Sequence, residues 1–166
     1  MLRYAQIRRI DITNGPGIRV SLFTQGCDIH CVGCFNSDIW DYLGGTLWTN
    51  EEKENFLNLC DRHEVRGISI LGGEPLSPQN YDDLKDLFKS FKERFPEKNI
   101  WMWTGRIFED LDDEQLEVVK LVDVLVDGPW VMSLGDFHLK YRGSSNQRII
   151  DVQRSLESNS VCELNL

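Results

Sequence analysis

Long hydrophobic runs are missing from this sequence. No stretch approaches the roughly 20 apolar residues that a helix needs to span a bilayer. The opening segment, MLRYAQIRRIDITNG, contains no continuous hydrophobic region of the kind found in secretion signals. We therefore expect a cytoplasmic protein that has no membrane partner.

Positive charge is also scarce. The 18 lysines and arginines stand against 27 aspartates and glutamates, which leaves a net charge of −9. A nucleic-acid backbone needs a basic surface, so we expect no nucleic-acid partner. Four arginines near the start (Arg3, Arg8, Arg9 and Arg19) form at most a local patch, and a solvated strand edge explains them better.

Cysteines are few and unevenly spaced. There are five, an odd number, and Cys60 and Cys162 lie far from each other and from the other three. A disulfide framework is not expected in a reducing compartment. The remaining three, Cys27, Cys31 and Cys34, follow the spacing C-x3-C-x2-C, which indicates metal ligands or catalysis.

The hydrophobic pattern alternates between strand and helix periods. It predicts strands at 17–26, 67–75, 99–105, 123–130 and 147–151, and helices at 49–65, 77–98 and 112–122. Such alternation implies right-handed parallel crossovers. A complete eight-fold barrel needs about 200 residues or more. The 166 residues therefore predict an α/β fold with mostly parallel strands, an incomplete, open (β/α) barrel. We expect one domain, with a core at about 4–150 and a peripheral tail at about 152–166.

The three clustered thiols are compatible with two metal sites. Structural zinc takes four ligands, and His30, inside the loop, would complete a Cys3His set. A 4Fe-4S cluster normally takes four thiolates. Three thiolates would leave one iron open to a substrate, as a catalytic zinc keeps one position open. The cysteines alone favour zinc and iron–sulfur equally.

A second motif, LGGEP, ends the next predicted strand at residues 71–75. Gly72 and Gly73 have no side chains, so a ligand can approach the backbone closely, and Glu74 adds a charge. Both motifs follow strands at their C-terminal ends, where barrels carry their chemistry. GGEP alone would indicate a plain turn, but the two motifs together indicate a site.

C-x3-C-x2-C followed by GGE resembles the signature of the radical S-adenosylmethionine (SAM) enzymes. Two further features are similar to their glycyl-radical activating enzymes: NGPGIRV at 14–20, and C-x-N at 34–36 with Trp40 nearby. The segments GGEPLSPQN, FPEKNIWMWTG, VDVLVDGPW and RGSSNQR resemble the branch that activates anaerobic (class III) ribonucleoside-triphosphate reductase. The resemblance covers about residues 4–150. Gly33 replaces an aromatic residue that often packs on adenine in the superfamily, which leaves the adenine contact unassigned.

This resemblance implies two cofactors, a 4Fe-4S cluster and SAM. Cys27, Cys31 and Cys34 would ligate three irons, and the open iron would chelate the amino and carboxylate groups of SAM. A reductant such as flavodoxin would supply the electron that cleaves SAM to methionine and a 5′-deoxyadenosyl radical. That radical would abstract a hydrogen atom from a glycine of the large subunit of the reductase.

The resemblance also implies the cofactor-binding residues, which are Gly72, Gly73, Glu74, Asn36, Thr104 and Asp127. The GGE segment would meet the methionyl ammonium. Asn36 would either bond near the cluster or cap a helix, and Thr104 and Asp127 would either line the cleft or form turns. Arg142–Arg148 (RGSSNQR) is rich in donors and would cover the site, contact the SAM carboxylate or contact the partner. Cys60 fits a small core residue.

Two alternatives stay open at this stage. Another radical SAM enzyme, such as a pyruvate formate-lyase activase or a deazaguanine-forming carbocycle synthase, is disfavoured by RGSSNQR. A non-enzymatic zinc-binding module is the other alternative. An iron–sulfur protein would be brown, whereas a zinc protein would be colourless.

Alanine at Cys27, Cys31 or Cys34 is expected to abolish cluster binding, because each removal leaves too few thiolates to hold the irons. Cys60→Ala and Cys162→Ala are the matched controls and should keep the cluster. The measurement is iron per chain after anaerobic reconstitution. Loss of iron from either control would place a ligand outside the loop and contradict the assignment.

Overall fold

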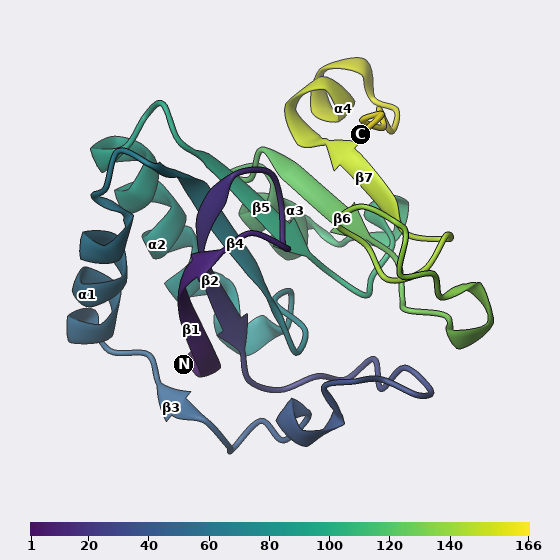
Figure 1. Cartoon of the computed structure of the whole chain (residues 1–166), viewed down its shortest axis with the longest axis horizontal. Coiled ribbons are helices and arrows are strands. Elements are labelled where there is room, and N and C mark those ends of the chain that lie inside the picture. Colours follow the sequence, from purple (N-terminus) through teal and green to yellow (C-terminus); the bar gives the residue numbers. More distant parts are fainter.

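Seven strands lie side by side in one open sheet, in the order β3-β1-β2-β4-β5-β6-β7 (Figure 1). The computed structural model describes all residues from Met1 to Leu166. The strands are β1 (Arg3–Asp11), β2 (Ile18–Thr24), β3 (Thr46–Leu47), β4 (Val65–Gly72), β5 (Asn99–Trp103), β6 (Val124–Asp127) and β7 (Arg148–Asp151). The α-helices are α1 (Asn50–Cys60), α2 (Tyr81–Arg94), α3 (Asp113–Val119) and α4 (Val152–Ser158). None of them is long and apolar enough to cross a membrane.

The centre of the sheet is parallel and its margins are antiparallel. β2, β4, β5 and β6 run in one direction, whereas β1, β3 and β7 pair antiparallel with their neighbours. The expected α/β fold is confirmed, and the expected parallel strands are its central four. The strand at Arg3–Asp11 was not predicted, because most of its side chains are exposed or only partly buried and leave no apolar run to recognise. Such a strand can pair antiparallel through the short connection before β2, without a crossover helix.

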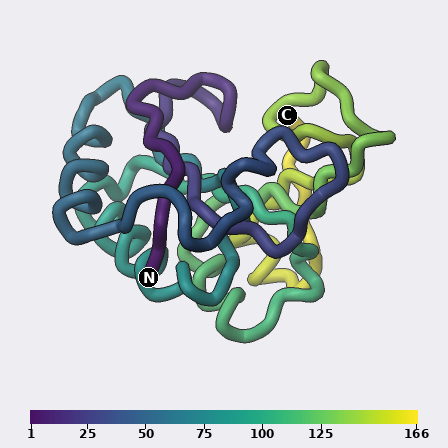
Figure 2. The backbone as a smooth tube through the Cα atoms, turned by 90° about the horizontal axis from the view of Figure 1, so that it is seen from below, coloured from purple at the N-terminus to yellow at the C-terminus, as the bar shows by residue number.

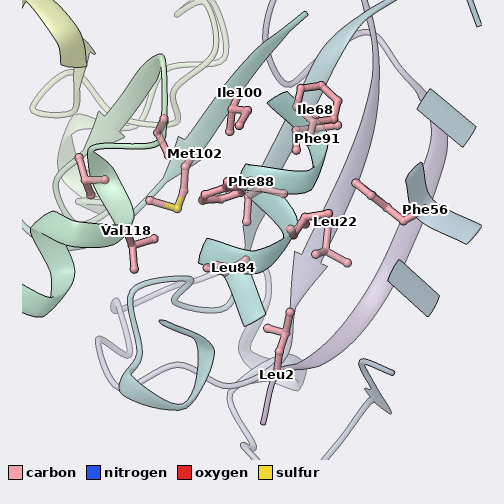
Figure 3. Packing of buried hydrophobic residues seen from close by; sticks show 14 of the residues in the cluster. Leu2, Leu22, Phe56, Ile68, Leu84, Phe88, Phe91, Ile100, Met102 and Val118 are labelled. Atoms are coloured by element: carbon pink, nitrogen blue, oxygen red, sulfur yellow. The ribbon is translucent and has the colours of Figure 1, made fainter. Parts of the chain in front are cut away.

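One face of the sheet carries the main hydrophobic core. Helices α1, α2 and α3 pack on this face, and their apolar side chains join those of the strands in a cluster of 25 buried residues (Figure 3). In α2, Leu84, Leu87, Phe88 and Phe91 are fully buried at helical spacing. Cys60 lies in this core at the end of α1, as expected, and burial raises the pKa of its thiol to about 12.

The opposite face of the sheet holds a buried polar network. Arg19 of β2 is fully buried, which corrects the expectation of a solvated edge for this residue. Its guanidinium donates to the Ser69 hydroxyl at 2.7 Å, to the Asn99 side-chain oxygen at 2.7 Å and to the carbonyl of Ile68 at 2.8 Å. A buried charge requires such partners, and burial lowers the pKa of Arg19 to about 10.

Asp11 fixes the loop between β1 and β2. Its buried carboxylate accepts hydrogen bonds from the N–H and hydroxyl of Thr13, the Asn14 amide and the Ser21 hydroxyl, at 2.6–2.9 Å. Burial by itself would raise the pKa of Asp11, but these four donors outweigh it and lower the pKa from 3.8 to about 2. The loop is therefore held against the sheet by an ionised side chain.

The C-terminal residues lie against the last strand. The N–H of Leu164 donates to the carbonyl of Ile149, and the N–H of Asp151 donates to the carbonyl of Cys162. The short helix α4 begins directly after β7, with the Asp151 side chain accepting from the N–H of Arg154. Figure 1 places this segment at the far edge of the sheet from β3.

Asp11→Asn is expected to lower the free energy of unfolding by about 2 kcal/mol at neutral pH, the value that the shift from 3.8 to about 2 implies. Because the folded pKa lies below the unfolded value, this stabilisation is complete well above pH 3.8 and is lost as the pH falls through about 2. Urea unfolding as a function of pH measures the difference. Asp61→Asn, at an exposed position, is the control and should change little at any pH. A gap between Asp11→Asn and wild type that persists undiminished at acid pH would contradict the assignment.

Candidate functional site

A cavity of about 440 Å³ lies at the carboxyl ends of the four parallel strands. The segments after β2, β4, β5 and β6 contribute its walls, together with residues 139–147. Eight of the nine predicted site residues line it: Cys27, Cys31, Cys34, Asn36, Gly72, Gly73, Glu74 and Thr104. Parallel strands bring these residues together because their carboxyl ends share one edge of the sheet.

The cysteine loop is closed at its base. The N–H of Gly26 donates to the carbonyl of Ile39 at 2.7 Å, and the N–H of Cys27 donates to the carbonyl of Trp40 at 3.1 Å. Both views of the backbone place the far end of this loop next to the segment that follows β6 (Figures 1 and 2). Phe35 contacts Trp130 there, with ring centroids 5.3 Å apart.

Backbone N–H groups lie close to the cysteine sulfur atoms. That of Asn36 donates to the Cys34 sulfur at 3.4 Å, while those of Ile29 and His30 are near Cys27 and that of Trp130 is near Cys31. His30 adopts a left-handed conformation with φ +52°, which is uncommon for a residue other than glycine. Burial raises the pKa of the Cys27 and Cys31 thiols, and these donors oppose that rise. Thiolates that accept such hydrogen bonds suit an iron–sulfur cluster, whose potential depends on them.

Asn36 precedes a short 3₁₀ helix at Ser37–Ile39, but its side chain makes no capping hydrogen bond. Asn36 thus holds the N-cap position that one alternative gave it, but without a capping bond from its side chain. The residue lines the cavity and its backbone N–H faces Cys34. A role beside the cluster stays a prediction.

The GGE segment is bonded to the backbone that leads into Cys27. The N–H of Gly73 donates to the carbonyl of Thr24 at 2.9 Å, and the N–H of Glu74 donates to the carbonyl of Gly26 at 2.8 Å. A Cβ atom on Gly73 would collide with the Gly26 carbonyl, and Gly72 has a φ of +109°. Both glycines are thus required by the contact between two loops. A larger residue at Gly73 would displace the cysteine loop as well as any ligand.

Glu74 is almost completely buried, with 1% of its surface exposed. Its carboxylate accepts from the Thr104 hydroxyl at 2.6 Å, the Gly105 N–H at 2.7 Å and the Leu76 N–H at 2.9 Å. Burial raises the pKa of the Glu74 carboxyl, while these donors and the nearby Arg106 guanidinium oppose the rise. The carboxylate therefore ties the end of β4 to the end of β5.

Sequence reasoning missed Arg106. Its Nη2 atom lies 3.0 Å from both carboxylate oxygens of Asp28, and its Nε donates to the carbonyl of Leu76 at 3.2 Å. Arg106 thus connects the cysteine loop to the segment after Glu74. The only available signal was a basic residue directly after the Thr-Gly pair that follows β5, and this residue belongs to no recognisable motif.

Asp127 is the one predicted residue that does not line the cavity. Its buried carboxylate accepts from Arg148 at 2.6 and 3.0 Å and from the N–H of Phe108 at 2.8 Å. Arg148 also pairs with Glu109 at 2.6 Å. Through these hydrogen bonds, Asp127 connects the end of β6 to the start of β7.

The segment Arg142–Arg148 folds into a turn beside the cavity. The Gln147 side-chain oxygen accepts from the N–H groups of Gly143 and Ser144, and Arg142 donates to the carbonyl of Gln147 at 2.6 Å. Arg142, Gly143 and Gln147 line the cavity. Other donors of the segment bind the chain after β6: the Asn146 amide donates to the carbonyl of Pro129 at 2.8 Å, and the Gln147 amide donates to the carbonyl of Gly128 at 3.0 Å.

The chain is similar to known proteins over nearly its whole length. Residues 13–150 match the family model described as a 4Fe-4S single cluster domain. A relative from Enterobacteria phage T4, named anaerobic ribonucleoside-triphosphate reductase-activating protein, is 41% identical over 148 residues, which cover 89% of this chain and 93% of the relative. Proteins of the same name from Salmonella typhi and Escherichia coli (strain K12) are 42% and 40% identical, each over 88% of this chain and 96% of the relative.

Arg106→Gln is expected to loosen the cysteine loop, because the loop loses its ion pair between Asp28 and Arg106. In the metal-free protein, Cys27, Cys31 and Cys34 should react several-fold faster with a thiol reagent, and mass spectrometry would locate the labels. Arg94→Gln removes an ion pair with Glu54 on the helical face and is the matched control. Equal labelling rates in the two variants would contradict a role for Arg106 in holding the loop.

Proposed function

Because this chain belongs to the family of anaerobic ribonucleoside-triphosphate reductase-activating proteins, we propose that it is a radical SAM oxidoreductase that generates a glycyl radical on a class III reductase. The observation that carries the proposal is that three thiols and the GGE segment share one cavity. We infer that its open sheet is an incomplete barrel of the radical SAM type. Its parallel strands and crossover helices α1–α3 support this inference. The chain is then a single domain with a core at about 4–150 and a tail at about 152–166.

The residues of the cavity fit a 4Fe-4S cluster. All three cysteines line one cavity, and the Cys34 sulfur accepts a hydrogen bond from the backbone N–H of Asn36. His30, the fourth ligand of the zinc alternative, instead stacks its ring on Trp40 with centroids 4.2 Å apart. The family description also supports a cluster. When bound, the cluster supplies the electron that cleaves SAM. Cys27, Cys31 and Cys34 would hold it, and a reductant such as flavodoxin would reduce it.

SAM would bind next to the GGE segment in the same cavity. Gly72 and Gly73 line this cavity, and we propose that their carbonyls receive the methionyl ammonium. The Glu74 carboxylate, which is bonded to Thr104 and Gly105, would keep this backbone in place. We assign Asn36 and Thr104 to the SAM side of the cavity, and we assign Asp127 to positioning β7.

The rim of the cavity suits a protein substrate. Phe35 and Phe137 are 74% and 95% exposed, and Val32 and Met132 are also exposed in the two segments that border the opening. Large exposed apolar side chains that gather at one place mark interaction sites. A partner segment that carries the glycine could cover these side chains as it enters.

The three cysteines must stay reduced in order to bind a cluster. We therefore propose that the protein works in the cytoplasm, which is a reducing compartment.

The direct test uses the large subunit of the reductase labelled with α-deuterated glycine. Incubated anaerobically with this protein, SAM and a reductant, it should develop a glycyl-radical signal in electron paramagnetic resonance. Deuterium should appear in 5′-deoxyadenosine, because the deoxyadenosyl carbon takes the atom that leaves the glycine. Cleavage of SAM without a radical on the reductase and without deuterium transfer would overturn the proposal.

Phe137→Asp tests the rim. It should lower the rate of radical formation on the reductase at least tenfold, because it places a charge in an apolar contact, while SAM cleavage in the absence of the reductase should be unchanged. Phe137 does not line the cavity, so cofactor binding is not disturbed. Ile10→Asp, at an exposed apolar position on β1, is the control. If both variants activate the reductase equally well, the partner does not bind at this rim.

A further inference from the structure

The indole N–H of Trp40 is a buried donor that has no partner in the protein. Trp40 lines the cavity together with the three cysteines. Buried polar groups without a hydrogen bond are rare in folded proteins, and each requires an explanation. Because Trp40 lines the cavity, a group bound there can supply the acceptor that this N–H lacks.

The Trp40 ring is held in place. It stacks on His30 with an interplanar angle of 9°, and the Trp40 carbonyl accepts from the N–H of Cys27 at 3.1 Å. The ring thus belongs to the base of the cysteine loop.

Trp103, in the wall of the same cavity, provides a contrast. Its indole N–H donates to the carbonyl of Tyr141 at 2.7 Å. This tryptophan needs no ligand to satisfy its donor. The indole donor that is both buried and without a partner is that of Trp40, in the loop of the three thiols.

We propose that Trp40 is a positioning residue for the iron–sulfur cluster, and that its indole N–H donates a hydrogen bond to a sulfur atom of the bound cluster. This inference rests on the proposed function. The backbone N–H of Asn36 already donates to the Cys34 sulfur, so the Trp40 N–H would add a side-chain donor to the same sulfur environment. A hydrogen bond to sulfur withdraws electron density from the cluster and stabilises its reduced state. Trp40 therefore raises the midpoint potential of the cluster and makes the entry of the electron easier.

Tryptophan labelled with ¹⁵N in the indole ring tests the contact directly. In the wild-type protein with its cluster reduced and no SAM added, pulsed electron paramagnetic resonance should detect a coupling to indole ¹⁵N. Trp40→Phe should lose this coupling, keep its iron and show a lower midpoint potential. Trp103→Phe is the matched control and should retain both the coupling and the wild-type potential.

Several results would overturn the proposal. They are the absence of a ¹⁵N coupling in the wild-type protein with an intact cluster, a coupling that appears only after SAM is added, and a coupling that survives in Trp40→Phe. If Trp40→Phe fails to assemble a cluster, the wild-type spectrum and that of Trp103→Phe still decide. Iron content and radical formation in the wild-type protein test the proposed function independently of the role of Trp40. A wild-type chain that activates the reductase but lacks the coupling would refute only the role of Trp40.

Discussion

The buried carboxylate of Glu74 joins the ends of neighbouring strands. Its two oxygens accept hydrogen bonds from Thr104 and Gly105 after β5, while its backbone N–H donates to the carbonyl of Gly26 after β2. A carboxylate removed from water needs these donors in place, so the three strand ends cannot move independently. The loop that begins at Cys27 therefore starts from a fixed base, and the walls of the cavity depend on this single contact.

The two faces of the sheet carry the packing that stabilises the fold, and the carboxyl edge of its parallel strands carries the candidate site. The helical face is apolar and closely packed, whereas the other face holds Arg19 and Asp11 in a network of hydrogen bonds. That network fixes the loop which carries Thr13 and Asn14 to the cavity wall. Rigid packing on one face and satisfied polar groups on the other leave the carboxyl edge free to present thiols, glycines and aromatic rings.

The candidate site was largely predictable, but the reasons for its residues were not. Cys27, Cys31 and Cys34 were recognisable because thiols at this spacing suit few purposes other than metal binding. Gly73 was expected to admit a ligand, and the structure adds that a side chain there would strike the Gly26 carbonyl. Asp127 was expected near the cavity because it ends a strand, yet its carboxylate pairs with Arg148 instead. The end of a strand predicts an edge of the sheet, and only the packed neighbours decide which way a side chain points.

By itself, the sequence determined the alternation of central strands and helices and the grouping of three thiols in one loop, because hydrophobic periodicity and cysteine spacing are local properties of the chain. Tertiary structure decided the antiparallel strands at the margins of the sheet, the ion pair between Arg106 and Asp28, and the lack of a hydrogen-bond partner for the indole N–H of Trp40. The first two features join residues that are distant in the chain, and the third depends on the absence of a hydrogen-bond acceptor near the indole. Whether a polar group is satisfied is known only when everything around it has been placed.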